Sequence, residues 1–176
     1  LEFRRVLFRS DSILGQTLTS WELILINDHS DDQSTKILGK FAQYDRRGRV
    51  LQNPGRGLVS ALNHGINNSQ AGMIARMDGD DIMKPKRLEI QVGHLQKNKN
   101  IDLISCQTQH FPRSLKRQRK GYERYVDWTN NILTFEDHLL NRFIDCPMAH
   151  PSVTFRKSII QKFGGYKEGE RSEEHT

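Results

Sequence analysis

A short apolar run that ends on a carboxylate constrains this chain most. Residues 23–26 are four consecutive aliphatic residues, and Asn27 and Asp28 follow them directly. A continuous apolar run bounded by polar residues is typical of a strand covered on both faces, as in a parallel sheet between helices. We therefore expect a buried strand over residues 21–28, with Asp28 at its carboxyl end.

Strand and helix patterns alternate along the rest of the chain. Further strands are predicted over residues 50–52, 73–77, 101–106 and 149–155. Helices are predicted from a cap at Asp31 or Asp32 through residue 44, over 58–66, from Pro85 through residue 95, over 135–143 and over 157–163. Periodicity weakens over residues 111–145. The alternation predicts an α/β layered domain with a mainly parallel sheet.

The charge is unevenly distributed. The formal net charge of +6 and the pI near 9.5 allow an anionic partner such as nucleic acid, lipid or a phosphorylated substrate. Residues 113–120 (RSLKRQRK) hold five basic residues in eight, and Tyr122, Tyr125 and Trp128 follow. This basic segment is either a solvated loop or a contact with anionic lipid or acceptor phosphates.

Membrane spans and disulfide frameworks are not indicated by the sequence. The longest uninterrupted apolar run, residues 23–26, is far too short to cross a bilayer. Cys106 and Cys146 lack the spacing of a zinc site or of a disulfide framework. We expect reduced thiols in a cytosolic protein.

Three carboxylates follow the predicted strand over residues 73–77. Asp78, Asp80 and Asp81 lie within four residues. Ligands of α/β sheets bind beyond the carboxyl ends of the strands, so these side chains and Asp28 should face one crevice. Mg²⁺ and Mn²⁺ prefer oxygen ligands and are commonly held by one or two carboxylates plus substrate phosphates. The same residues could equally form a turn and a helix cap.

Several motifs occur in a fixed order along the chain. They are Gln16-Thr17, WELILINDHS at residues 21–30, Asn53-Pro54-Gly55 with ALNHGI at 61–66, MDGDD at 77–81, and PKRL at 85–88. In this order they resemble the successive signatures of family 2 glycosyltransferases, over roughly residues 12–169. The resemblance implies a GT-A type nucleotide-diphospho-sugar transferase fold, which is a Rossmann-like α/β/α sandwich.

The resemblance also implies roles for the carboxylates. Asp28 would accept a hydrogen bond from the nucleotide base, and Asp80 would bind Mn²⁺ or Mg²⁺. Asp78 would meet the ribose, the metal or a metal-bound water. Asp81 would either support these groups or cap the next helix.

The basic site residues are Arg56, Arg76 and His150. The two arginines are the nearest cations able to reach a diphosphate, although each could equally be solvated or ion-paired. His150 matches a histidine that lies near the leaving diphosphate in many relatives, and the alternative is a structural histidine.

The sequence departs from the family pattern in a few places. Asn27 replaces an acid, His29 replaces a glycine, and Leu62 stands where relatives often carry arginine. We expect residues 1–10 and 171–176 to be non-native, with the family domain over residues 11–170, divided into a nucleotide-binding half (11–110) and an acceptor-side half (111–170). The opening strand and the catalytic base, an aspartate, would then be missing and the chain inactive.

The expected activity is transfer of a sugar, with inversion, from a nucleoside diphosphate sugar to an acceptor hydroxyl. A UDP-sugar is the expected donor and a glycan or lipid-linked molecule the acceptor, in bacterial cell-surface polysaccharide or lipopolysaccharide synthesis. We expect a cytoplasmic location, with peripheral contact at the inner face of the plasma membrane left open, and no nucleic-acid partner. The alternatives are a nucleotidyltransferase and a non-catalytic basic nucleic-acid-binding module.

Overall fold

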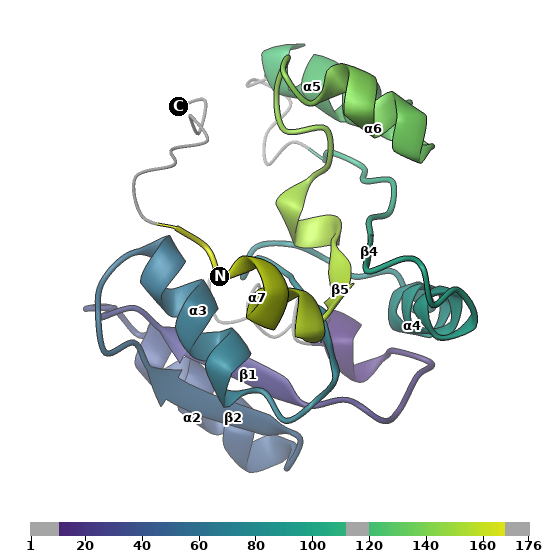
Figure 1. Ribbon diagram of the computed structural model, residues 1–176. Helices are drawn as coiled ribbons and strands as arrows, with labels where there is room; N and C mark the ends of the chain where they lie inside the picture. The colour runs from purple at the N-terminus through teal and green to yellow at the C-terminus, as the bar shows by residue number, and fades with distance from the viewer. Residues whose placement is uncertain (1–10, 112–119, 168–176) are drawn as a thin grey trace.

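The computed structural model describes residues 11–111 and 120–167, in which helices and strands alternate (Figure 1). The elements of the first half are β1 (Leu23–Asn27), α2 (Ser34–Tyr44), β2 (Gly48–Gln52), α3 (Leu58–Asn68), β3 (Met73–Ala75), α4 (Arg87–Lys97) and β4 (Leu103–Ile104). Those of the second half are α5 (Lys120–Asn130), α6 (Phe135–Asn141), the 3₁₀ turn η1 (His150–Ser152), β5 (Thr154–Arg156) and α7 (Ser158–Phe163). The predicted α/β class is confirmed.

The strands form two hydrogen-bonded groups. β1 and β2 are parallel, with Leu23 opposite Gly48 and Asn27 opposite Gln52. α3 packs against β1, and α2 packs against β2. This β–α–β unit is the parallel part of the fold that the apolar run of β1 predicts.

β5 lies between β3 and β4 and runs antiparallel to both. Periodicity locates a strand but does not set its direction, so the antiparallel arrangement was not predictable from the pattern. The strand predicted over residues 149–155 also begins late, because residues 150–152 form η1. Pro151 lies in the first turn of η1, where its missing N–H costs no ladder hydrogen bond.

The main apolar core joins α3, β5 and α7. Ile66, Val153 and Phe155 are its buried members. Partly buried side chains that pack against them are Ile74, Met148, Ile159, Ile160 and Tyr166. The core therefore fixes the position of α3 relative to η1, which carries His150.

Gln91 of α4 is a buried polar side chain whose amide oxygen and nitrogen are both hydrogen-bonded within the fold. Its Nε2 donates to the Ser152 carbonyl oxygen at 2.9 Å, while its Oε1 accepts from Thr154 Oγ1 at 2.7 Å and from Arg87 Nε at 3.0 Å. Buried amides are tolerated only when paired in this way. α4 is thereby tied to both η1 and β5.

Gln16 supports the start of α4 from a distant part of the sequence. The N-cap residue of α4, Lys86, makes no side-chain capping bond. Instead the buried Gln16 accepts from the Leu88 backbone N–H at 3.1 Å and donates to the carbonyl oxygens of Ser12 at 3.0 Å and Lys84 at 2.8 Å. One amide thus satisfies a helix N-terminus and fixes the loop before it.

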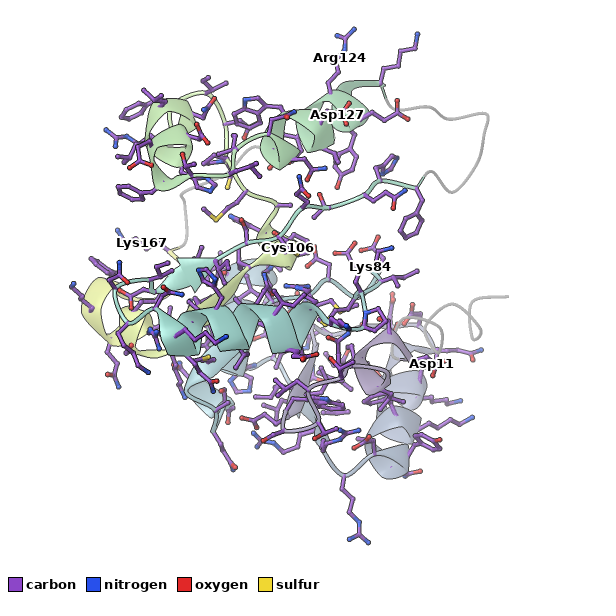
Figure 2. All side chains as sticks on the ribbon, turned by 90° about the vertical axis from the view of Figure 1, so that its right-hand side faces the viewer. Asp11, Lys84, Cys106, Arg124, Asp127 and Lys167 are labelled. Carbon is purple, nitrogen blue, oxygen red and sulfur yellow. The ribbon has the colours of Figure 1, made fainter. Side chains whose placement is uncertain are left out.

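α5 is the one long helix that the weak periodicity of residues 111–145 did not predict. Its aromatic side chains form a row, with ring centroids 6.2 Å apart for Tyr122 and Tyr125 and 5.9 Å apart for Tyr125 and Trp128. α5 and α6 form a layer above the rest of the chain in Figure 1, and Figure 2 shows Arg124 and Asp127 well separated from Lys84 and Cys106. Of the predicted basic segment, residues 113–119 lie outside the described residues.

Neither a membrane-spanning helix nor a disulfide is found in the part of the chain that is described. Over 11–111 and 120–167, no helix combines the length and the apolar character needed to cross a membrane. Cys106 and Cys146 are not joined in a disulfide.

Replacing Gln16 by alanine is expected to lower the free energy of unfolding by about 1–3 kcal/mol, because it leaves the Leu88 N–H without its buried partner. Urea denaturation followed by circular dichroism measures this. Gln43→Ala on the exposed face of α2 is the control and should change stability by less than about 0.5 kcal/mol. Equal stabilities for the two variants would show that Gln16 does not brace α4.

Candidate functional site

Asp28 directly follows β1, and the loop between β2 and α3 holds its carboxylate. Oδ1 accepts from Asn53 Nδ2 at 2.7 Å, and Oδ2 accepts from the Gly57 backbone N–H at 2.9 Å. The Asn53 hydrogen bond is the main cause of a lowered Asp28 pKa, and the Gly57 N–H and the charges of His29 and Arg56 add to it. Asp28 is therefore an exposed, ionised and oriented acceptor.

Asn53 organises this loop, although the sequence analysis identified it only as part of a family motif. It is completely buried, its backbone N–H donates to the Asn27 carbonyl oxygen at 2.9 Å, and its Oδ1 accepts from Ser60 Oγ at 2.8 Å. His29 adds a second tie, with Nε2 at 2.8 Å from the Gly55 carbonyl oxygen. These contacts attach the β2–α3 loop to the end of β1.

Asn27 has a structural role that uses the N–H groups of its side-chain amide. Its buried Nδ2 donates to Gln52 Oε1 at 2.9 Å and to Thr35 Oγ1 at 3.2 Å. A carboxylate at this position would have no N–H to donate. The departure from the family pattern therefore matches the neighbours that this chain provides.

Arg76 follows β3 and is the most deeply buried charged side chain near the acidic loop. Its side chain is 7% exposed, and Nη2 forms an ion pair with Asp78 Oδ1 at 2.9 Å. Nε and Nη1 are buried and have no hydrogen-bond partner among the described residues. Buried N–H groups of a cation are costly without acceptors, so this position suits an anionic ligand.

Asp80 and Asp81 differ in environment. Asp80 is exposed, whereas Asp81 is half-buried and its backbone N–H donates to the Asp78 carbonyl oxygen at 3.2 Å. Burial, and then the charges of Asp78 and Asp80, raise the pKa of Asp81. In the part of the chain that is described, no three acidic, histidine or cysteine side chains converge on a ready-made cation site.

His150 lies close enough to Arg76 and Asp78 for both charges to affect its pKa. Burial and then the charge of Arg76 lower its pKa, while Asp78 acts in the opposite direction, so the imidazole is held neutral. Its ring meets Tyr166 edge-on, with centroids 6.5 Å apart. The sequence did not identify Tyr166 as a site residue, because its position depends on contacts far away in the chain.

The structure thus groups the predicted residues into two sets. Arg56 acts on Asp28 through its charge, from an exposed position. Arg76, Asp78 and His150 form the second set, in which Arg76 and Asp78 both affect the His150 pKa. That both sets face one crevice stays a prediction.

Replacing Asp81 by asparagine should stabilise the chain at neutral pH. The folded-state pKa of Asp81 is raised, so its ionisation opposes folding above that pKa and has no effect when the group is protonated in both states. The gain should be below about 1 kcal/mol because the side chain is half-exposed. It should be larger at pH 7.5 than at pH 4.5 in urea denaturation. Asp31→Asn, on an exposed loop, is the control and should change stability by less than about 0.5 kcal/mol, whereas a pH-independent gain for Asp81→Asn would contradict the burial of its charge.

Comparisons with known proteins identify the family of this chain. The family model for Glycosyl transferase family 2 matches residues 4–164. The chain is 33% identical over 172 residues to the O-antigen biosynthesis glycosyltransferase WbnJ of Escherichia coli, covering 94% of this chain and 61% of WbnJ. It is 32% identical over 174 residues to the bifunctional glycosyltransferase pgtA of Dictyostelium discoideum, covering 85% of this chain and 23% of pgtA. The chain therefore spans less than two thirds of either relative.

The fold is also similar to a solved structure, the mannosyltransferase PcManGT from Pyrobaculum calidifontis in complex with GDP-Man and Mn²⁺. The TM-score is 0.66 at 16% sequence identity, and the match covers 94% of this chain and 44% of that one. At this identity the likeness shows the fold, and it confirms the predicted GT-A type. With a family match over most of its length, the chain belongs to glycosyl transferase family 2, a family of enzymes.

Proposed function

We propose that this chain carries the donor site of an enzyme that transfers a sugar from a nucleoside diphosphate sugar to an acceptor hydroxyl. The observation that carries the proposal is the buried guanidinium of Arg76, whose Nε and Nη1 have no partner among the described residues. It lies beside Asp78, in a chain of the glycosyltransferase family. A diphosphate oxygen would supply the missing acceptors.

A divalent cation fits the loop of residues 78–81, which follows β3 and Arg76. Asp78 and the exposed Asp80 offer carboxylate oxygens, and Mg²⁺ is usually held by one or two carboxylates together with substrate phosphates. Mn²⁺ or Mg²⁺ would neutralise charge on the diphosphate leaving group when bound. The similar mannosyltransferase was solved with GDP-Man and Mn²⁺.

The remaining site residues would bind either the nucleoside or the diphosphate. The ionised and oriented Asp28 would accept a hydrogen bond from the nucleotide base. Arg56 and Arg76 would bind diphosphate oxygens, with Arg76 already fixed by its ion pair and Arg56 free to approach from an exposed loop. A neutral His150 could donate one hydrogen bond to the leaving diphosphate without adding charge.

The acceptor and the reaction course complete the proposal. Inversion requires a base that takes the proton of the acceptor hydroxyl as it attacks the anomeric carbon, and no described residue is assigned to that role. One relative is named for O-antigen biosynthesis, which supports a glycan or lipid-linked acceptor in cell-surface polysaccharide synthesis. We retain a UDP-sugar as the expected donor and the cytoplasmic side of the membrane as the expected location.

The direct test is nucleotide binding by calorimetry. UDP and GDP, each with and without Mn²⁺, are titrated into the chain and into Asp80→Ala. We expect Mn²⁺ to strengthen binding and Asp80→Ala to remove that gain, a loss of about tenfold or more. Asp81→Asn should lose less, and Asp31→Ala should behave as the unchanged chain.

Equal affinities with and without Mn²⁺ would refute the metal assignment. Full Mn²⁺ dependence in Asp80→Ala would show that another residue holds the cation. Absence of binding for both nucleotides, with binding to single-stranded DNA or RNA instead, would favour a nucleic-acid-binding module.

A further inference from the structure

Asn63 of α3 forms two hydrogen bonds with the backbone of Tyr166, and we call this pair of hydrogen bonds the Asn63 clamp. Its Nδ2 donates to the Tyr166 carbonyl oxygen at 2.8 Å, and its Oδ1 accepts from the Tyr166 N–H at 2.9 Å, across 103 residues of sequence. The side-chain amide thus pairs with Tyr166 as a neighbouring peptide group in a sheet would. The segment after α7 is thereby attached to α3 (Figure 1).

Two glycines before Tyr166 make this clamp possible, each for a different reason. Gly164 ends α7 with φ of 84°, in the left-handed region that glycine favours. Gly165 lies so close to Asn63 that a Cβ there would overlap the side-chain amide. The Gly-Gly-Tyr sequence therefore fits the clamp residue by residue.

The clamp sets the position of the Tyr166 ring. The ring is half-buried, packs against the core of Ile66, Val153 and Phe155, and meets His150 edge-on at 6.5 Å. Burial raises the Tyr166 pKa, the charge of Arg76 opposes this and that of Asp78 adds to it. Tyr166 therefore lies within the electrostatic reach of the second set of site residues.

α3 lies between the two sets and contacts Asp28 of the first set and Tyr166 beside the second. At the N-terminal end of α3 the Gly57 N–H donates to Asp28. Further along the helix, Gly65 lies close to β1, since a Cβ there would be 3.6 Å from Ile26 Cγ1. Asn63 projects from the same helix. Functional groups on a packed helix are held more accurately than groups on loops.

We propose that Asn63 is a positioning residue for the diphosphate side of the donor site: by clamping Tyr166 it keeps the phenol ring beside His150 and limits water around Arg76. The inference rests on the proposed function. An ion pair or charged hydrogen bond is stronger where water is excluded, so loosening Tyr166 should weaken contacts to the diphosphate. Contacts of the nucleoside with Asp28 should not change.

The test compares Asn63→Ala with Asn67→Ala, which removes an exposed asparagine from the same helix. Two quantities are measured on the chain: hydrogen exchange of the Tyr166 amide, and affinity for UDP and GDP with Mn²⁺ beside affinity for uridine and guanosine. In Asn63→Ala we expect exchange to accelerate by on the order of tenfold and diphosphate affinity to fall about threefold to tenfold, as for one net hydrogen bond, with nucleoside affinity unchanged. Asn67→Ala should alter none of these.

Two further variants keep the inference testable if Asn63→Ala folds poorly. Asn63→Asp retains the acceptor for the Tyr166 N–H and should keep part of the exchange protection. Gly165→Ala should disrupt the same contact, because its Cβ would overlap the Asn63 side-chain amide. Its effect should not add to that of Asn63→Ala, because both substitutions remove the same contact.

An unchanged Tyr166 exchange rate in Asn63→Ala would overturn the inference, as would equal losses of diphosphate and nucleoside affinity. If the unsubstituted chain binds neither UDP nor GDP, the proposed function fails and the diphosphate role of Asn63 fails with it. Accelerated exchange would then still identify Asn63 as the residue that fixes Tyr166, so the two failures are distinguishable.

Discussion

Arg87 and Gln91 of α4 make the contacts on which the positions of Arg76 and His150 depend. Arg87 Nη2 donates to the Arg76 carbonyl oxygen at 2.9 Å and to that of Val153 at 3.3 Å, and Gln91 donates to that of Ser152. Partial burial lowers the pKa of Arg87, and these carbonyl acceptors compensate for the water that its guanidinium loses. Because the carbonyls belong to the segments that carry Arg76 and His150, one polar network aligns both with α4.

This network explains why Arg76 keeps its position although two of its side-chain nitrogen atoms have no hydrogen-bond partner among the described residues. Arg76 is held through its backbone, which donates to the Val153 carbonyl oxygen at 3.0 Å and accepts from Arg87, and through one ion pair to Asp78. Its Nε and Nη1 therefore stay in place without partners among the described residues. Groups fixed in advance by the fold bind a ligand with little cost in reorganisation. The packing around Arg76 is therefore what supports the proposed binding of a diphosphate at this position.

Local sequence patterns were sufficient for part of this result. The apolar run before Asp28 located β1, and the carboxylates at residues 78–81 follow β3 closely, as expected. The direction of β5 was not predictable from local patterns, because it depends on strand pairing. The helix α5 was missed although Tyr122, Tyr125 and Trp128 recur at three-residue intervals, a spacing that places them on one face of a helix. Gln16 and Asn63 act across 72 and 103 residues. Such partners cannot be read from local patterns, although both residues lie in motifs that the family resemblance marks.

If a nucleotide and a divalent cation bind together at the ends of β1 and β3, the cation should lie near the amides of residues 78–81. Nuclear magnetic resonance of the ¹⁵N-labelled chain with UDP or GDP and a small amount of Mn²⁺ tests this, because a bound paramagnetic ion broadens nearby amide signals. We predict nucleotide-dependent broadening of Gly79 and Asp80 together with a shift of the Gly57 amide, which donates to Asp28. Broadening that is independent of nucleotide, or that is confined to α5 and α6, would contradict a donor site at this place.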